Sequence, residues 1–379
     1  MYPRLLVPPA EKSFFLFGPR GTGKTTWVRS KFPGALYFDL LKAETYNYLL
    51  ANPTRIEESI PPRFTDWVVI DEIQKIPQLL DEVHRLIETR NYKFVLTGSS
   101  ARKLRRGGVN LLAGRALIYY LHPLTAAELG NDFRLNEYLQ FGGLPGVFSA
   151  EDKTDYLKSY LQAYLQQEIT QEGISRNLGA FGRFLETASF SQGSVLNMAE
   201  VAREAAVGRR MAENYFAALE DLLIGIRLPV FAKKAKRKLV SHGKFYLFDT
   251  GVYRALRPAG PFDQPEFIGG MALESLFFQN LRAINDYLGL DYHLYYYRTV
   301  AGAEVDFIAY GKRGLKAFEV KSKRNIFPND LTGLKSFLGD YPVAKGYVIY
   351  GGNRKIYKGG MEIWPISEAL RSLPEILSC

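Results

Sequence analysis

The chain has 379 residues, a net charge of +10 at pH 7 and 47% hydrophobic residues, which describes a folded protein with room for two or three domains. Its single cysteine, Cys379, excludes an intramolecular disulfide bond and a cysteine-based zinc site and fits a reducing cytoplasm, and the lack of a signal-peptide pattern or a long apolar run argues against a membrane partner. The basic balance favours anionic partners such as nucleic acid.

The first predicted strand, in the stretch FFLF, leads directly into the phosphate-binding pattern G-x-x-x-x-G-K-[ST]. Glycines at these positions let main-chain N–H groups turn onto a triphosphate, and a helix expected over residues 25–30 would point its positive end there. Lys24 would reach the β- and γ-phosphates, and Thr25 would hold Mg²⁺. We therefore expect ATP and Mg as cofactors. The residues expected to bind the nucleotide are Gly18, Pro19, Arg20, Gly21, Thr22, Gly23, Lys24, Thr25 and Thr26.

A second apolar strand, expected over residues 66–72, ends in the adjacent carboxylates Asp71 and Glu72. A short strand at 35–39 and a helix at 42–51 are expected before it. Asp71 would bind Mg²⁺ through water, and Glu72 would orient and deprotonate the attacking water, because a nucleotide hydrolase must place its metal and polarise its nucleophile. A solvated strand end would also explain the pair, but the phosphate-binding pattern upstream favours hydrolysis.

Two further strands, expected over residues 93–99 and 116–121, complete the first third of the chain. Strands that alternate with helices imply a parallel sheet with its ligand at the carboxyl ends of the strands. Thr97, with Ser99 as the alternative, would lie near the γ-phosphate and sense hydrolysis. The Thr-Gly-Ser-Ser stretch also suits an ordinary turn.

Basic residues collect between these last two strands. Arg115, just before the second of them, suits an arginine finger that acts on the ATP of a neighbouring subunit, and a solvated basic loop is the alternative. The other cations of this loop are expected to contact the phosphates of a polynucleotide. They are Arg102, Lys103, Arg105 and Arg106.

The middle of the chain predicts a helical lid, then two helices and a basic hairpin. The expected elements are helices over 155–172, 181–191, 198–206 and 210–223 and strands over 228–231 and 245–248. The last two helices and the strands are typical of a helix-turn-helix with a wing, a module that binds either DNA or other proteins. The wing cations expected to contact DNA are Lys233, Lys234, Lys236, Arg237 and Lys238.

The last third predicts a helix, three strands, a helix and a strand. Their expected ranges are 269–286, 292–298, 303–309, 315–321, 330–338 and 345–350. Asp306 and Glu319 could share a Mg²⁺ ion, Lys321 lies on the same strand face as Glu319, and Glu274 could add a carboxylate from the helix. The D-x12-E-x-K spacing and the element order resemble the PD-(D/E)XK nuclease superfamily. The leading Pro-Asp is missing because Val305 precedes Asp306, so a DNA-binding or purely structural face is the alternative.

Several stretches between Gly18 and Lys323 carry a resemblance that covers nearly the whole chain. They are GPRGTGKTT, VVIDEIQKIP, LTGSS, LAGRA, LHPLTAAEL, GGLPGV, KFYLFDTGVYRAL, ALES and GAEVDFIA…FEVKSK. Together they resemble a bacterial or archaeal AAA-type ATPase that carries a C-terminal domain of unknown function. The resemblance implies an α/β chain with an AAA+ P-loop core (1–135), a helical lid (136–192), a winged-helix-like module (193–250) and a PD-(D/E)XK nuclease-like domain (251–379). By analogy it also implies a homo-oligomeric ring, often a hexamer.

Three functions are consistent with these features. The first is an ATP-driven DNA motor or remodeller, supported by the nucleotide site and the basic clusters and suited to branched DNA such as forks or junctions. The second is an ATP-gated nuclease that cuts with Asp306, Glu319 and Lys321. The third is a nucleotide switch that controls a protein partner.

Overall fold

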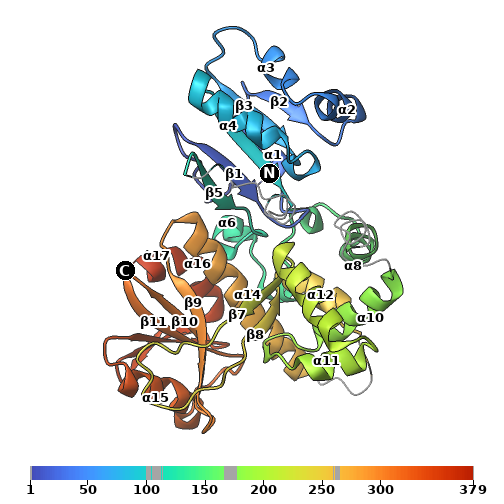
Figure 1. Ribbon diagram of the computed structural model, residues 1–379. Helices are drawn as coiled ribbons and strands as arrows, with labels where there is room; N and C mark the ends of the chain where they lie inside the picture. Colours follow the sequence, from blue (N-terminus) through green and yellow to red (C-terminus); the bar gives the residue numbers. More distant parts are fainter. Residues whose placement is uncertain are drawn as a thin grey trace. The chain divides into compact units, whose positions relative to one another are not determined.

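The computed structural model describes residues 2–99, 104, 112, 114–165, 177–258, 260 and 265–378. The chain divides into two compact units (Figure 1). The first unit consists of Leu6–His122 and Asp221–Leu223, and the second consists of Met1–Leu5, Pro123–Glu220 and Ile224–Cys379. Within the described residues, no helix is long and apolar enough to cross a membrane.

The first unit is built on a five-stranded sheet in the order β2-β3-β4-β1-β5, in which every pairing is parallel. Its strands are β1 (Ser13–Phe17), β2 (Leu36–Asp39), β3 (Trp67–Asp71), β4 (Lys93–Gly98) and β5 (Ala116–Tyr120). Its helices are α1 (Lys24–Lys31), α2 (Ala43–Ala51), α3 (Arg55–Glu58), the 3-10 turn η1 (Ile73–Lys75) and α4 (Leu79–Arg90). The expected parallel sheet is confirmed, and this α/β core is consistent with a P-loop AAA domain.

Alternation along β1 supplies both faces of this sheet with apolar side chains. Phe14 makes edge contacts with the rings of Trp27 on α1 and Trp67 on β3. Phe15 and Phe17 are fully buried in the opposite cluster, which also contains the buried face of α4. Because β1 and β3 are buried on both faces, they read in sequence as continuous apolar runs.

One part of the second unit consists of helices and a small antiparallel sheet in the order β6-β8-β7. The elements in chain order are α10 (Leu178–Ser189), β6 (Ser194–Val195), α11 (Met198–Glu204), α12 (Arg209–Asp221), β7 (Gly225–Leu228) and β8 (Lys244–Leu247). The strand predicted at 228–231 is wrong, because β7 ends at Leu228. Pro229 has no N–H to extend the ladder, and Val230 instead forms an isolated bridge with Tyr296.

The second unit also contains a six-stranded sheet, ordered β13-β14-β12-β11-β10-β9. Its elements in chain order are α14 (Pro265–Tyr287), β9 (His293–Arg298), β10 (Glu304–Gly311), β11 (Gly314–Lys321), α15 (Thr332–Asp340), β12 (Lys345–Tyr350), β13 (Ile356–Lys358), β14 (Met361–Pro365), α16 (Ile366–Arg371) and α17 (Leu373–Ser378). The predicted order of a helix, three strands, a helix and a strand is confirmed.

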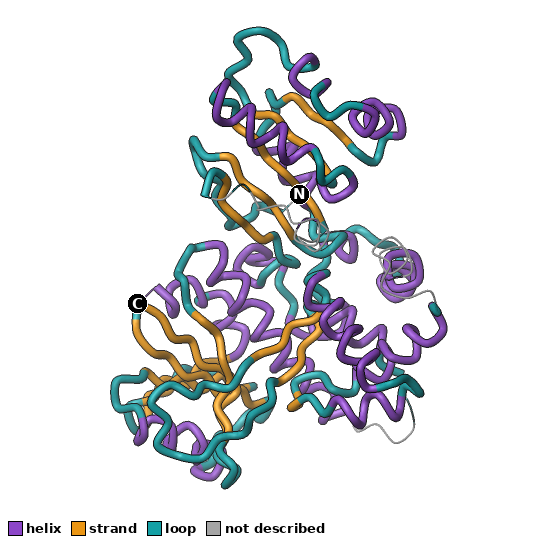
Figure 2. Tube along the Cα trace, in the orientation of Figure 1, coloured by secondary structure: helices purple, strands orange, loops and turns teal. Residues whose placement is uncertain are grey.

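Helices cover this sheet on its two faces, as the tube view shows (Figure 2). Phe307 and Phe318 belong to a buried cluster with α14, α16 and α17. Their chain neighbours Ile308 and Ala317 belong to a second cluster with α15. The two clusters explain the period-two pattern of the strands.

The described residues of the second unit also form the helices α6 (Ala126–Leu129), α7 (Leu135–Phe141), α8 (Lys153–Tyr160) and α13 (Thr250–Leu256). The helix predicted over 155–172 is observed as α8 followed by a π-helical turn at Leu161–Leu165, and its remainder lies outside the described residues. Glu128 closes a capping box with Thr125 at the start of α6. Glu128 also forms a buried ion pair with Arg4, with 2.9 Å between Nε and Oε1. This ion pair attaches the N-terminal arm to the start of α6.

Candidate active site

The phosphate-binding loop joins β1 to α1 and depends on its glycines. A Cβ on Gly18 would lie 2.3 Å from the carbonyl oxygen of Leu121, so no larger residue fits there. Gly23 has a φ of +90°, a conformation that glycine adopts without strain. Lys24 follows at the start of α1 and is buried, and its Nζ donates to the carbonyl oxygens of Gly18 (2.7 Å) and Pro19 (3.2 Å). The loop therefore holds the ammonium group at its own centre.

Asp71, at the end of β3, is the buried centre of the polar contacts beside this loop. The hydroxyl of Thr25 donates to its Oδ2 at 2.9 Å, the hydroxyl of Tyr37 donates to the same oxygen, and the hydroxyl of Thr97 donates to Oδ1. Burial and the bond to Asp71 raise the pKa of Tyr37 above its usual value, so this phenol stays a donor. Tyr37 lies on the neighbouring strand β2, and no sequence pattern marks it as a partner of Asp71.

Thr97 connects the two acidic residues. Its Oγ1 accepts the main-chain N–H of Glu72 at 3.2 Å while its hydrogen goes to Asp71. Thr97 lies 25 positions after Glu72 and 26 positions after Asp71 in the sequence, and the parallel pairing of β3 with β4 brings the three residues together. The structure therefore places Lys24, Thr25, Asp71, Glu72 and Thr97 around the carboxyl ends of β1, β3 and β4.

Glu72 itself is held by a residue that the sequence analysis missed. The Nε2 of Gln74 donates to Oε2 of Glu72 and, at 3.2 Å, to the hydroxyl of Ser99. Glu72 has a left-handed backbone (φ 62°, ψ 46°) and begins the 3-10 turn that carries Gln74. A Cβ on Gly98 would lie 2.6 Å from Gln74 Oε1, which explains the glycine of the LTGSS stretch. The only sequence signal for Gln74 was its position two residues after Glu72.

Replacing Gln74 by alanine is expected to lower kcat for ATP hydrolysis by about tenfold and to leave KM for ATP nearly unchanged. The loss of one hydrogen bond to a charged group is worth about 1.5 kcal/mol, and a factor of ten corresponds to about 1.4 kcal/mol. The matched control is Gln78→Ala, on an exposed residue at the start of α4. Steady-state kinetics with an equal loss in both variants would contradict a positioning role for Gln74.

Arg115 lies directly before β5, with its guanidinium paired to Glu88 on α4. Both side chains are partly exposed, at 37% and 52%, so the group is accessible. The arginine-finger role stays a prediction. The basic residues Arg102, Lys103, Arg105 and Arg106 lie outside the described residues.

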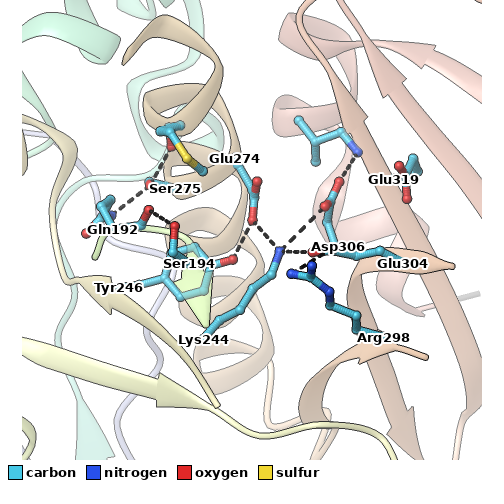
Figure 3. A network of polar contacts seen from close by, with 12 residues as sticks. Gln192, Ser194, Lys244, Tyr246, Glu274, Ser275, Arg298, Glu304, Asp306 and Glu319 are labelled. Atoms are coloured by element: carbon cyan, nitrogen blue, oxygen red, sulfur yellow. Dashed lines mark hydrogen bonds and ion pairs between the residues drawn. The ribbon is translucent and has the colours of Figure 1, made fainter. Parts of the chain in front are cut away.

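A cluster of carboxylates forms in the second unit around a lysine (Figure 3). The Nζ of Lys244 lies 3.1 Å from Glu274 Oε1, 2.7 Å from Glu304 Oε1 and 3.8 Å from Asp306 Oδ1. Asp306 Oδ2 accepts the N–H of Val320 at 2.8 Å. The predicted residues Glu274 and Asp306 are thus brought together, but sequence analysis did not place Lys244 or Glu304 with them.

Glu319 and Lys321 pair with each other beside this cluster, with 2.5 Å between Nζ and Oε1. Burial, and then the charge of Asp306, raise the pKa of Glu319 well above its usual value. Burial also raises the pKa of Glu274 to about 7, against the opposing effect of Lys244. Burial alone would lower the pKa of Lys244, but the three carboxylates reverse this and raise it, so the lysine is charged.

The predicted basic wing is the exposed loop between β7 and β8. Lys233, Lys234, Lys236 and Lys238 are exposed. Arg237 is tied to Asp340 of α15, with 2.6 Å between Nε and Oδ2. The main chain of the loop lies along β9, where the N–H of Phe231 donates to Tyr296 and that of Val240 to Arg298.

Three family matches divide the chain. Residues 10–130 match the family described as AAA domain, residues 132–263 match a domain of unknown function (DUF8612), and residues 269–369 match another domain of unknown function (DUF4143). The AAA match supports an AAA-type ATPase in the first unit. The predicted C-terminal domain of unknown function is also present.

Two solved structures that match the chain have low sequence identity to it. The crystal structure of protein VC1899 from Vibrio cholerae is 10% identical, with 97% of each chain covered and a TM-score of 0.25. The crystal structure of NtrX from Brucella abortus is 12% identical, with 74% of this chain and 60% of that chain covered and a TM-score of 0.23. No curated protein matches the sequence.

Proposed function

We propose that the protein is a Mg²⁺-dependent ATPase whose turnover is coupled to DNA. The observation that carries the first part is the convergence of Lys24, Thr25, Asp71 and Glu72 at one sheet edge. These residues fit Mg²⁺ and a nucleotide, because hydroxyl and carboxylate oxygens are the ligands that Mg²⁺ prefers, and the buried Lys24 supplies a positive charge within the glycine loop. Mg²⁺, when bound, would neutralise charge on the phosphates.

Each residue of this site has a separate task. Lys24 would exchange its carbonyl partners for phosphate oxygens. Glu72, held in place by Gln74 and by the contact of its N–H with Thr97, would orient the attacking water and take its proton. Asp71 and Thr25 would hold the metal, and Arg115 would reach the ATP of a neighbouring subunit in a ring, by analogy with a hexamer.

The coupling to DNA rests on the small sheet of the second unit. The order of α10, β6, α11, α12, β7 and β8 and the sheet order β6-β8-β7 support a winged-helix-like module. In such a module the second helix of the helix-turn-helix would enter the major groove, and the loop between β7 and β8 would be the wing. Arg210 and Asn214 on α12 are exposed, as are the wing lysines. These features support contacts to DNA phosphates.

Binding to duplex, forked and four-way DNA is expected to weaken steeply with salt and to stimulate ATP turnover. Each lysine that contacts a phosphate contributes about −0.9 to the slope of log affinity against log salt. The double variant Lys234→Gln/Lys236→Gln should therefore flatten this slope by about two. A matched control is Lys335→Gln/Lys358→Gln, on exposed lysines of α15 and β13.

The outcomes of this experiment separate the alternatives. Equal slopes in both double variants would remove the wing from the DNA contact. Slow turnover that no DNA changes would favour a nucleotide switch that controls a protein partner. Stimulation by branched DNA above plain duplex would support action at forks or junctions.

A further inference from the structure

The carboxylates of Glu274, Glu304 and Asp306 surround a cation, which is the ammonium group of Lys244 (Figure 3). This side chain is 4% exposed and makes ion pairs with Glu274, Glu304 and Asp306 at 3.1, 2.7 and 3.8 Å. The acids come from α14 and β10, whereas the lysine comes from β8. Two separate parts of the second unit thus build the cluster together.

The position of Lys244 is fixed by its strand. β8 is the central strand of the small sheet, and Lys244 pairs with Val195 on one side and Leu228 on the other. Two residues along the same face, the hydroxyl of Tyr246 donates to Glu274 Oε1 at 2.5 Å. The lysine is therefore held by a paired backbone and a neighbouring hydrogen bond.

A divalent ion does not fit this arrangement. Mg²⁺ needs about six oxygen ligands at about 2.0–2.1 Å, and the oxygens of Glu274, Glu304 and Asp306 that face the centre are engaged by the ammonium. Asp306 Oδ2 accepts a main-chain N–H, and Glu319 Oε1 pairs with Lys321. Among the described buried side-chain atoms, Glu319 Oε2 is the one of this cluster without a hydrogen-bond partner. The described residues contain no group of three or more acidic, histidine or cysteine side chains that could hold a metal ion.

We infer that Lys244 is an internal cation that takes the place of a divalent metal on the D…ExK face, which is the surface formed by Asp306, Glu319 and Lys321. This face would then not support metal-dependent cleavage. The second unit would then contribute to binding and to stability, without cutting a DNA strand. This inference is independent of ATP hydrolysis in the first unit.

The experiment measures Mn²⁺ binding to the nucleotide-free full chain by electron paramagnetic resonance, with Asp306→Asn as the probe of this face. In the wild-type chain, Asp306→Asn is expected to leave Mn²⁺ binding unchanged. In Lys244→Ala, one further Mn²⁺ site is expected, and adding Asp306→Asn should remove it. Lys244→Arg keeps the charge and should gain no site.

Thermal melting gives a second readout. Lys244→Ala leaves Glu274 and Asp306 without their lysine partner, whereas Glu304 keeps Arg298 at 3.5 Å. Tm should therefore fall, and Mn²⁺ should raise it again in this variant alone. Wild-type Mn²⁺ binding that Asp306→Asn weakens would overturn the inference, as would a folded Lys244→Ala chain without a new site. If Lys244→Ala does not fold, the wild-type comparison with Asp306→Asn decides the matter by itself.

Discussion

Glu72→Gln is expected to lower the rate of ATP hydrolysis by about 10²–10⁴-fold, which is the usual contribution of a general base, while ATP binding is retained. The amide keeps the shape and the contact with Gln74 but cannot take a proton from water. Single-turnover hydrolysis and titration with a fluorescent nucleotide measure the two effects separately.

The control for this substitution is Glu58→Gln, on an exposed glutamate at the end of α3. It should hydrolyse ATP at the wild-type rate. Wild-type turnover in Glu72→Gln would show that a different group activates the water. Weaker nucleotide binding in Glu72→Gln would instead indicate a structural role for this carboxylate.

Glu128→Ala is expected to reduce the free energy of unfolding by about 3–5 kcal/mol, because removing one partner of a buried ion pair leaves the other charge uncompensated. Glu128 is fully buried and Arg4 is 7% exposed. The same carboxylate accepts the N–H groups of Leu5 and Thr125, both at 2.9 Å. Its loss would release the N-terminal arm and the start of α6 together.

Glu213→Ala provides the comparison, because Glu213 also pairs with an arginine but on the surface. Its partner is Arg209, at 3.1 Å, and the two side chains are 46% and 72% exposed. The expected change is about 0.3–0.5 kcal/mol, as for other exposed pairs one helical turn apart. Urea denaturation that gives similar losses for both variants would contradict the importance of burial at Glu128.

The residues of the candidate nucleotide site could be proposed from the sequence because they lie in short stretches with strong local rules. The glycines, Lys24 and Thr25 occupy one loop, and Asp71 and Glu72 are adjacent at a strand end. Parallel pairing then brings the loop and the strand end to one edge. Tyr37 and Gln74 were missed because a tyrosine on a neighbouring strand and a glutamine after an acidic pair have no distinctive spacing.

The strand predicted at 228–231 shows a different limit. Apolar residues continue past Leu228, so periodicity alone extends the strand, but Pro229 cannot donate to the ladder. The chain then crosses to β9, where the N–H of Phe231 donates to the carbonyl of Tyr296. This partner is remote in sequence, and no local pattern identifies it.

The sequence by itself determined a chain with a P-loop, a Mg²⁺-compatible acidic pair and the order of the elements around them, because each of these depends on neighbouring residues. Only the tertiary structure decided the state of the D…ExK face. Lys244 belongs by sequence to a basic stretch, yet strand pairing buries it 3.1 Å from Glu274, which lies 30 positions away. A buried charged side chain pairs with the opposite charge that tertiary packing places beside it, and the spacing of residues along the sequence does not reveal which residue that is.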